Sequence, residues 1–240
     1  NGLLSLFSKS LSIPMSIRRV IEEQEKRLSL TNLNQDYLLD LFEDKNRIAF
    51  QGAAGTGKTW IAMKKAERLA SAGKRVLFLC YSKTLGSFIN ERLGENENTD
   101  VMTFHSFARG VLRDFISGEI EAHNCADSFF KLIGKIKEAD IPSEPKEKKD
   151  PSDKTLQQKI NGVIGMMMAL RPGADYKSAV DAYCESLPKA LLDVVSLLIP
   201  SDDSSDDFFS ERLPLAVETA FGAESGHLEK YTYDAVIVDE

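Results

Sequence analysis

The sequence is poor in the residues that build disulfide scaffolds and metal centres. Its 240 residues include three cysteines, Cys80, Cys125 and Cys184, and three histidines. Three widely spaced cysteines provide neither a disulfide framework nor a paired metal motif, so we expect a reducing, cytoplasmic environment. His123 lies two residues before Cys125. One such pair falls short of the four ligands that a zinc site requires.

Long hydrophobic runs are also absent. No apolar stretch approaches the roughly 18 residues that a membrane-spanning helix needs, so we expect no membrane partner. The opening NGLLSLFSKSLSI has no basic segment before its apolar part and no small-residue cleavage site, which argues against a secretory signal. The first residue is Asn rather than Met. We therefore expect the chain to be an excerpt of a longer protein.

Positive charge is scarce in the second half of the chain. Residues 1–120 hold 17 Lys and Arg against 14 Asp and Glu, a net of +3, whereas residues 121–240 hold 13 against 23, a net of −10. The overall charge of −7 is unfavourable for a dedicated nucleic-acid binder. A site for a polyanion is therefore expected on the first half.

Residues 46–117 alternate between strand-like apolar runs and helical patterns. The predicted strands are 47–51, 75–81 and 101–104, and the predicted helices are 57–73, 83–93 and 105–116. Two further helices are predicted upstream, at 16–30 and 32–44. This alternation indicates an α/β fold in which helices flank a parallel sheet.

The pattern changes after residue 117. Segment 141–154 has three prolines and many charges, which predicts an exposed loop, and 201–207 (SDDSSDD) is a second polar interruption. The pieces between them look helical, and strand character returns only at 233–240. Residues 118–230 therefore predict a mostly helical insertion between strands of one sheet. Its acidic surface needs no functional explanation, because charged side chains on the outside of a helical lobe simply face water.

The strongest motif is GAAGTGKT, which matches G-x-x-x-x-G-K-[ST] between a predicted strand and a predicted helix. Its glycines let backbone N–H groups face a phosphate, and the helix N-terminus adds positive potential. Lys58 then reaches the β- and γ-phosphates of ATP, and the Thr59 hydroxyl ligates Mg²⁺. The predicted nucleotide-binding residues of this loop are Gly52, Ala53, Ala54, Gly55, Thr56, Gly57, Lys58 and Thr59.

Two carboxylates end the chain, in YDAVIVDE. A buried strand can present acids at its carboxyl tip, where open α/β sheets place their ligands. Beside a phosphate-binding loop, we expect Asp239 to hold Mg²⁺ through water and Glu240 to polarise the attacking water. Lys58 and Glu240 are thus the predicted catalytic residues. Without that loop, the same stretch would read as a strand followed by an acidic turn.

Five segments resemble, in order, the motifs of UvrD-type superfamily 1 DNA helicases. LTNLNQ, ending at Gln35, is similar to the glutamine motif, and GAAGTGKT to motif I. VLFLCYSKTLGSFINERL is similar to motif Ia, VMTFHSFA to motif Ib, and YDAVIVDE to the start of motif II. The resemblance implies a RecA-like domain. Within this family, the chain most resembles bacterial helicase-like proteins that carry a nuclease-related domain upstream.

The resemblance also implies individual roles. Gln35 would read the adenine edge, and Trp60, where many relatives have Arg, would stack on adenine or pack in the core. Tyr81 would stack on a base or end a strand, and His105 would contact nucleic acid or serve as a cap. The full set implied for single-stranded DNA, or RNA, is Tyr81, Ser82, Lys83, Thr103, His105 and Ser106. Lys83 stands where relatives often have Asn.

The resemblance implies a domain plan. Residues 1–29 would be a lead helix, 30–117 with 231–240 an incomplete RecA-like ATPase domain, and 118–230 an accessory-like insertion. A second RecA-like domain in cis would supply arginine fingers, so this piece alone is expected to be nearly inactive. Two alternatives stay open: a P-loop ATPase that moves no nucleic acid, and a nucleotide-binding module for protein interaction.

Overall fold

The computed structural model describes residues 36–43, 45–93, 97–140, 155–170, 175–200, 208–223 and 226–239. The chain divides into two compact units, Asn1–Arg68 and Leu69–Glu240, and each is described by itself. The predicted helix at 16–30 and the predicted loops at 141–154 and 201–207 lie outside the described residues, as do Gln35 and Glu240.

The first unit contains a short helix at 36–41 and most of helix α2, Lys58–Ser71. Of the residues with helical spacing along α2, Ala66 and Ala70 are buried, whereas Ala62 and Leu69 are half-buried. The helix ends at Ser71, and Gly73, two residues later, has a left-handed φ of 78° that suits glycine. The predicted strand at 47–51 is wrong: this segment is coil, because the ladder bonds that define strands join only the three strands of the second unit among the described residues.

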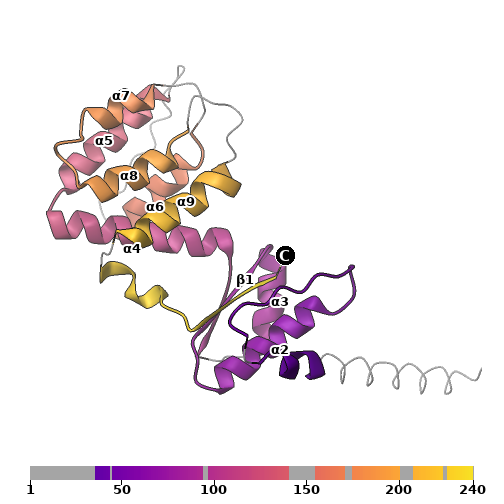
Figure 1. Cartoon of the computed structure of the whole chain (residues 1–240). Coiled ribbons are helices and arrows are strands. Elements are labelled where there is room, and N and C mark those ends of the chain that lie inside the picture. The colour runs from indigo at the N-terminus through magenta and orange to yellow at the C-terminus, as the bar shows by residue number, and fades with distance from the viewer. Residues whose placement is uncertain are drawn as a thin grey trace, which may run out of the picture. The chain divides into compact units, whose positions relative to one another are not determined.

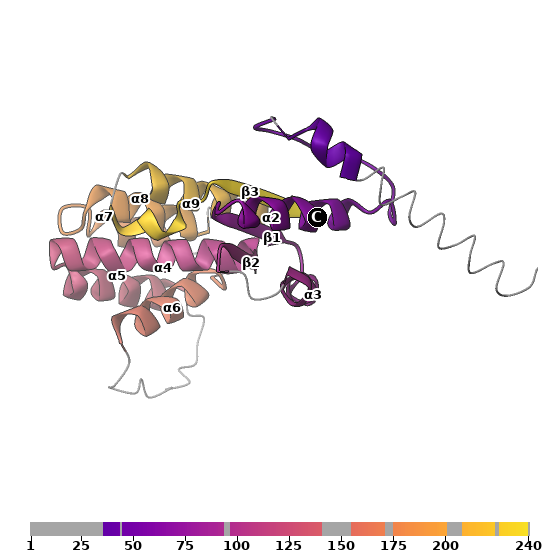
Figure 2. The same cartoon turned by 90° about the horizontal axis from the view of Figure 1, so that it is seen from below.

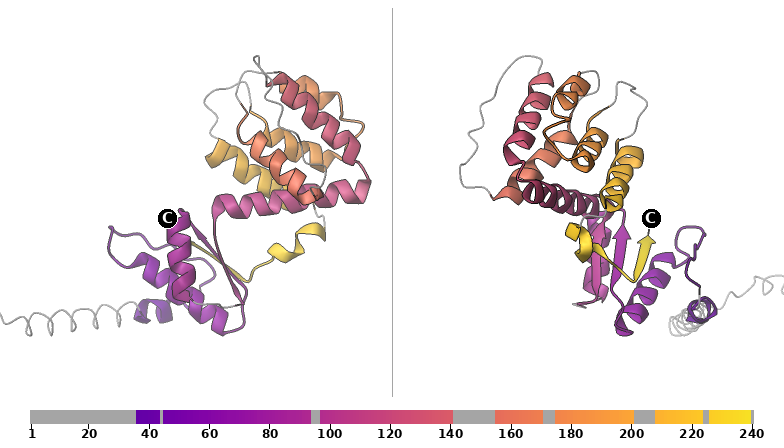
Figure 3. Two further views of the ribbon diagram at one scale, coloured as in Figure 1. Left: turned by 180° about the vertical axis from the view of Figure 1, so that it is seen from behind. Right: turned by 60° about the vertical axis from the view of Figure 1, so that its left-hand side comes forward.

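The sheet of the second unit is parallel, with strand order β2-β1-β3. Its strands are β1 Val76–Cys80, β2 Thr99–Thr103 and β3 Ala235–Asp239. β1 is central and buried along its whole length, as its continuous apolar run predicts. The register aligns Cys80 with Thr103 on one side and with Asp239 on the other. The carboxyl ends of all three strands therefore form one edge (Figure 3).

Helices α3, Lys83–Leu93, and α4, Phe104–His123, follow β1 and β2 directly. α3 has the predicted bounds. α4 is longer than predicted and passes residue 118 without a break, so the predicted start of the insertion falls inside this helix. α4 ends at Asn124, in the left-handed conformation, which Asn tolerates better than most residues.

Beyond α4, the described residues form the predicted mostly helical lobe (Figures 1 and 2). Its elements are α5 Ala126–Ala139, α6 Leu156–Met167, α7 Tyr176–Asp181, α8 Lys189–Leu198, η2 Phe208–Arg212, α9 Leu213–Gly222 and η3 Gly226–Tyr231. α4 packs against α6 and α9, and α8 packs against α9.

One hydrophobic core joins the lobe to the sheet. It contains Leu77 and Leu79 of β1, and it continues through Val111 and Phe115 of α4 into the lobe. Because one core spans both parts, the lobe and this sheet form one compact body. None of the helices that the structure describes combines the length and apolar character required to cross a membrane.

Candidate nucleotide-binding site

The glycine-rich loop folds as its sequence predicts. Gly55 and Gly57 have φ angles of 79° and 85°, a region that side chains rarely allow. A Cβ on Gly52 would lie 3.0 Å from the Thr56 hydroxyl oxygen, so a side chain there would crowd the loop. Backbone conformation therefore favours glycine at two of these positions and close packing at the third, which fits a loop that brings its backbone close to a phosphate.

Lys58 folds back over this loop. Its Nζ donates to the carbonyl oxygens of Gly52 and Ala53, each at 2.9 Å. Thr56 Oγ1 also donates to the Ala53 carbonyl, at 2.9 Å. Residues 52–56 are exposed, and α2 starts at Lys58, so the positive end of that helix follows the loop. If a phosphate binds in this loop, its charged oxygens can replace the two carbonyl oxygens as partners of the Lys58 ammonium.

The remaining predicted residues of this region lie along α2. Thr59 and Trp60 are half-buried in its first turn, and Lys64 Nζ lies 5.8 Å from the centroid of the Trp60 ring. This cation–π contact joins two residues of the same helix. Stacking of the Trp60 ring on adenine stays a prediction.

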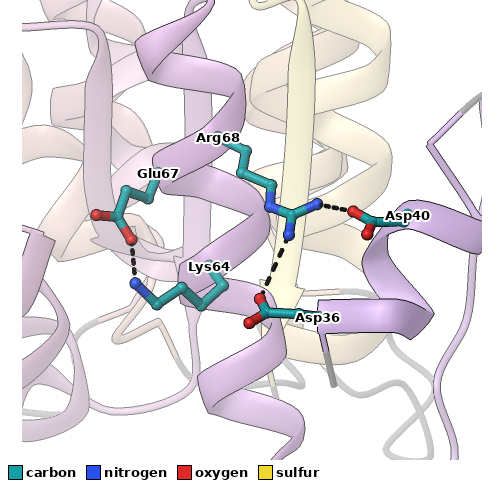
Figure 4. Close-up of polar contacts among 5 residues, drawn as sticks. All are labelled: Asp36, Asp40, Lys64, Glu67 and Arg68. Atoms are coloured by element: carbon teal, nitrogen blue, oxygen red, sulfur yellow. Dashed lines mark hydrogen bonds and ion pairs between the residues drawn. The ribbon is translucent and has the colours of Figure 1, made fainter. Parts of the chain in front are cut away.

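Arg68 joins α2 to the helix at 36–41 (Figure 4). Its guanidinium contacts Asp40 at 2.5 Å and Asp36 at 3.3 Å, two acids one turn apart. The hydrogen bond to Asp40 raises the pKa of Arg68. Asp36 directly follows Gln35 in the sequence. The pairs are exposed, so their contribution to stability is small.

Asp239 has the surroundings of a carboxylate that could hold a cation. Its side chain lies at the carboxyl end of β3, the residue is 7% exposed, and its Oδ2 has no hydrogen-bond partner among the described residues. A buried carboxylate oxygen without a partner is costly, and a cation or an ordered water would satisfy it. Burial, and then the charge of Asp239, raise the pKa of the neighbouring Cys80 thiol. A carboxylate oxygen such as Asp239 Oδ2 is a donor that Mg²⁺ prefers.

The same edge of the sheet carries the residues predicted to contact nucleic acid from motif Ia. Tyr81 follows β1 and is 82% exposed, so its ring is free to stack. Ser82 Oγ accepts from the Leu85 N–H at 3.1 Å and thereby caps α3, which begins at the exposed Lys83. Of these three residues, Tyr81 has the surroundings that a base-stacking role requires.

The motif Ib residues lie at the start of α4. Thr103 is buried, and its hydroxyl oxygen accepts from the Ser106 N–H at 3.2 Å as the N-cap of the helix. His105 and Ser106 are exposed. The structure thus assigns Thr103 a capping role, and leaves the two exposed side chains accessible.

Phe209 is a candidate that sequence reasoning missed. It comes from η2 in the helical lobe, is 48% exposed, and its ring meets the His105 ring edge-on with centroids 4.9 Å apart. About a hundred residues separate the two in sequence, so no local pattern could have paired them. Among the described residues, no group of three or more His, Cys, Asp or Glu could hold a metal ion.

Comparison with known proteins gives one family. A model of the family described as type III restriction enzyme, res subunit, matches residues 15–161, which is more than half of the chain. The matched range contains the glycine-rich loop and the motif Ia and Ib segments, and it ends before β3. No curated protein and no solved structure matches. The chain belongs to the family of type III restriction enzyme res subunits, and its α/β fold is that of an ATP-binding, helicase-type RecA-like motor domain.

Proposed function

We propose that this chain is the ATP-binding motor domain of a superfamily 1 DNA helicase or translocase of the UvrD type. Such a protein couples ATP hydrolysis to movement on single-stranded nucleic acid. The observation that carries the proposal is the loop Gly52–Thr59, with two glycines at positive φ and the Lys58 ammonium folded into it. The superfamily assignment rests on the motif Ib run Thr103–Ser106, which lies at the carboxyl end of β2.

In this proposal the loop binds the phosphates of ATP. Lys58 would exchange its bonds to the Gly52 and Ala53 carbonyls for bonds to the β- and γ-phosphates. A bond from the ammonium to a charged phosphate oxygen is stronger than the bond to a neutral carbonyl oxygen that it replaces. Ala54, Gly55, Thr56 and Gly57 would contribute backbone N–H groups. Gln35, just before the helix at 36–41, would read the adenine edge beside Trp60.

Asp239 and Thr59 would hold Mg²⁺, which supplies charge neutralisation on the γ-phosphoryl group as the bond to ADP breaks. Glu240, the next residue after Asp239, would accept a proton from the attacking water as its oxygen bonds to phosphorus. The products are then ADP and inorganic phosphate. A second RecA-like domain in cis would complete the cleft with an arginine finger.

The nucleic acid would lie along the edge where β1 and β2 end. Tyr81 would stack on one base, and His105, backed by the ring of Phe209, would present an aromatic face to another. Lys83 and Ser106 would contact the sugar–phosphate backbone. The domain plan that we propose keeps 30–117 with 231–240 as the motor and 118–230 as the accessory insertion.

Calorimetric titration of ADP with Mg²⁺ tests the nucleotide site. We expect Lys58→Ala to weaken binding by at least about tenfold, because a charge-assisted hydrogen bond is worth roughly 1.5–3 kcal/mol. Lys64→Ala is the matched control, since this lysine lies on the same helix and pairs with Glu67. Equal affinities for the Lys58 and Lys64 variants would refute the proposed site.

Fluorescence anisotropy with labelled oligo(dT) and oligo(rU) tests the helicase part separately. Stacking on one base is worth about 1–3 kcal/mol, so Tyr81→Ala should weaken binding by roughly 5- to 150-fold without changing ADP affinity. Phe88→Ala is the control, because Phe88 is another exposed aromatic residue, on α3. If the wild-type chain binds ADP and Tyr81→Ala binds both oligonucleotides as well as wild type does, a P-loop ATPase without nucleic-acid movement is the better reading.

A further inference from the structure

Arg75 lies immediately before β1, at the end of the sheet opposite to Asp239. Its guanidinium donates to the carbonyl oxygens of Thr232 and Lys230, at 3.0 and 3.1 Å, and its Nη2 lies 3.5 Å from Asp100. The same guanidinium lies 4.8 Å from the centroid of the Tyr233 ring. One side chain thus contacts several points of the segment that leads from η3 into β3.

The backbone of Arg75 completes this arrangement. Its N–H donates to Asp234 Oδ2 at 2.7 Å, and its carbonyl oxygen accepts from the N–H groups of Asp234 and Ala235. The Tyr233 hydroxyl donates to Asp100 on β2 at 2.8 Å. We call the set Arg75, Asp100, Tyr233 and Asp234 the register clamp. It ties the start of β3 to both other strands of the sheet.

The apolar side chains of β3 specify its register only weakly. Val236 and Val238 are 57% and 64% exposed, and Ala235 and Ile237 are only half-buried. A strand whose register is not fixed by a buried face can slip, and a slip of one residue moves every side chain to the opposite face. A slip would also displace Asp239 along the strand by about 3.3 Å.

We propose that the register clamp around Arg75 is the device that places Asp239 in the metal site. Arg75 is a positioning residue, because it acts through β3 and lies roughly 16 Å from the Asp239 position, five residue steps along the strand. The register aligns Val76 with Ala235 at the clamp and Cys80 with Asp239 at the site, so fixing the first pair fixes the last. This inference rests on the proposed metal role of Asp239.

The alternative is that the clamp only stabilises the fold. Each of its contacts is partly exposed, and an exposed ion pair contributes little to stability. A loss of stability alone would lower the affinity for ADP with and without metal to the same extent. A displaced Asp239 would instead lower only the affinity that Mg²⁺ adds. The ratio of the two affinities therefore separates positioning from stability.

The experiment is a calorimetric titration of ADP into the whole chain, once with MgCl₂ and once with EDTA. The measured quantity is the Mg²⁺ gain, the dissociation constant in EDTA divided by that in Mg²⁺. We expect a gain of at least about tenfold for wild type, and its loss in Asp239→Asn, since a bond to a charged group is worth roughly 1.5–3 kcal/mol. Arg75→Gln should reduce the gain at least about threefold and leave the affinity in EDTA unchanged.

Two further variants sharpen the result. Arg75→Lys should behave like Arg75→Gln, because an ammonium cannot reproduce the planar fork that reaches two carbonyl oxygens and stacks on Tyr233. Arg92→Gln is the matched control, as Arg92 is an exposed arginine that lies over the Phe88 ring of α3. If Arg75→Gln does not fold, Asp234→Ala can replace it, since this variant removes one contact of the clamp. It should also reduce the Mg²⁺ gain and leave the affinity in EDTA unchanged.

The outcomes are distinct. An undiminished Mg²⁺ gain in Arg75→Gln, together with its loss in Asp239→Asn, would overturn the clamp and leave the metal site standing. An equal loss of affinity in both buffers would assign Arg75 a purely structural role. If wild type shows no gain, or Asp239→Asn retains it, the proposed metal site itself is wrong and the inference falls with it.

Discussion

Asp114 offers the sharpest test of the structure, because it is a buried carboxylate held by three partners. It lies on α4 with its side chain 6% exposed. Arg113 approaches it at 2.7 Å, Lys230 at 2.5 Å and the Tyr231 hydroxyl at 2.6 Å. Lys230 and Tyr231 belong to η3, so this cluster fastens the segment that precedes β3 to the helical lobe.

The size of the effect follows from the pKa of Asp114. Burial raises it, but the hydrogen bonds from Arg113, Lys230 and Tyr231 outweigh burial and lower the pKa from 3.8 to about 2. Each pKa unit corresponds to 1.36 kcal/mol, so the charged form contributes roughly 2 kcal/mol of stability. Because the folded pKa is depressed, this contribution is fully present above about pH 4 and is lost as the pH falls towards 2.

The perturbation is Asp114→Asn, which keeps the shape of the side chain and removes its charge. At pH 7 we expect the free energy of unfolding to fall by roughly 2 kcal/mol, because the charge that lowers the pKa of Asp114 is gone. The loss should not be larger, since Arg113 and Lys230 are partly exposed and can be solvated by water instead. As the pH falls from 4 to 2, the difference between variant and wild type should shrink. Urea denaturation followed by far-UV circular dichroism measures both quantities.

Asp193→Asn is the control, since Asp193 is an exposed acid on α8. It should change the free energy of unfolding by less than about 0.5 kcal/mol at either pH. A difference for Asp114→Asn that stays constant from pH 7 to pH 2 would show that the charge is not the source of the stability. No destabilisation at pH 7 would refute the cluster as drawn.

Two other predictions concern glycines. Gly55→Ala places a side chain at a φ of 79°, so we expect about 1–2 kcal/mol of destabilisation and weaker ADP binding by calorimetry, whereas Gly134→Ala, inside α5 with open space around it, should stabilise the fold by up to about 1 kcal/mol. A Gly55→Ala variant that binds ADP normally would contradict the loop conformation. Gly118→Ala would make a Cβ overlap the His227 ring, so it should cost about 1–3 kcal/mol in thermal denaturation, and adding His227→Ala should recover most of that loss. If the double variant is no more stable than Gly118→Ala, the close approach of His227 is not the cause.

The sequence predicted most of the local structure. The continuous apolar run at 76–80 folds as the central buried strand, and the helical spacing at 83–93 forms a helix with those bounds. The glycine spacing of residues 52–59 predicted a loop that needs positive φ. These features depend on neighbours within a few residues, so a short window of the sequence is enough to predict them.

The predicted strand at 47–51 shows where local pattern fails. Its apolar residues suit a strand, but a strand also needs a ladder partner, and the sequence does not contain that information. α4 continues past the predicted end at 116 because Phe115, Ile116 and Ile120 bury their side chains in the core of the lobe. Burial of that face decided the length of the helix.

The site shows the same division. The sequence nominated Lys58, Asp239 and His105 as candidate site residues by residue type and motif order, and their roles stay predictions. Only the tertiary structure leaves the Asp239 Oδ2 buried without a partner among the described residues, sets Phe209 against His105, and holds β3 in register through Arg75. The last two bring together residues from distant parts of the chain, about 104 positions apart for His105 and Phe209 and 157 for Arg75 and Thr232. Such contacts form only when strands pair and helices pack. A local sequence pattern therefore determines which functional groups are present, and the packed fold determines which of them come together.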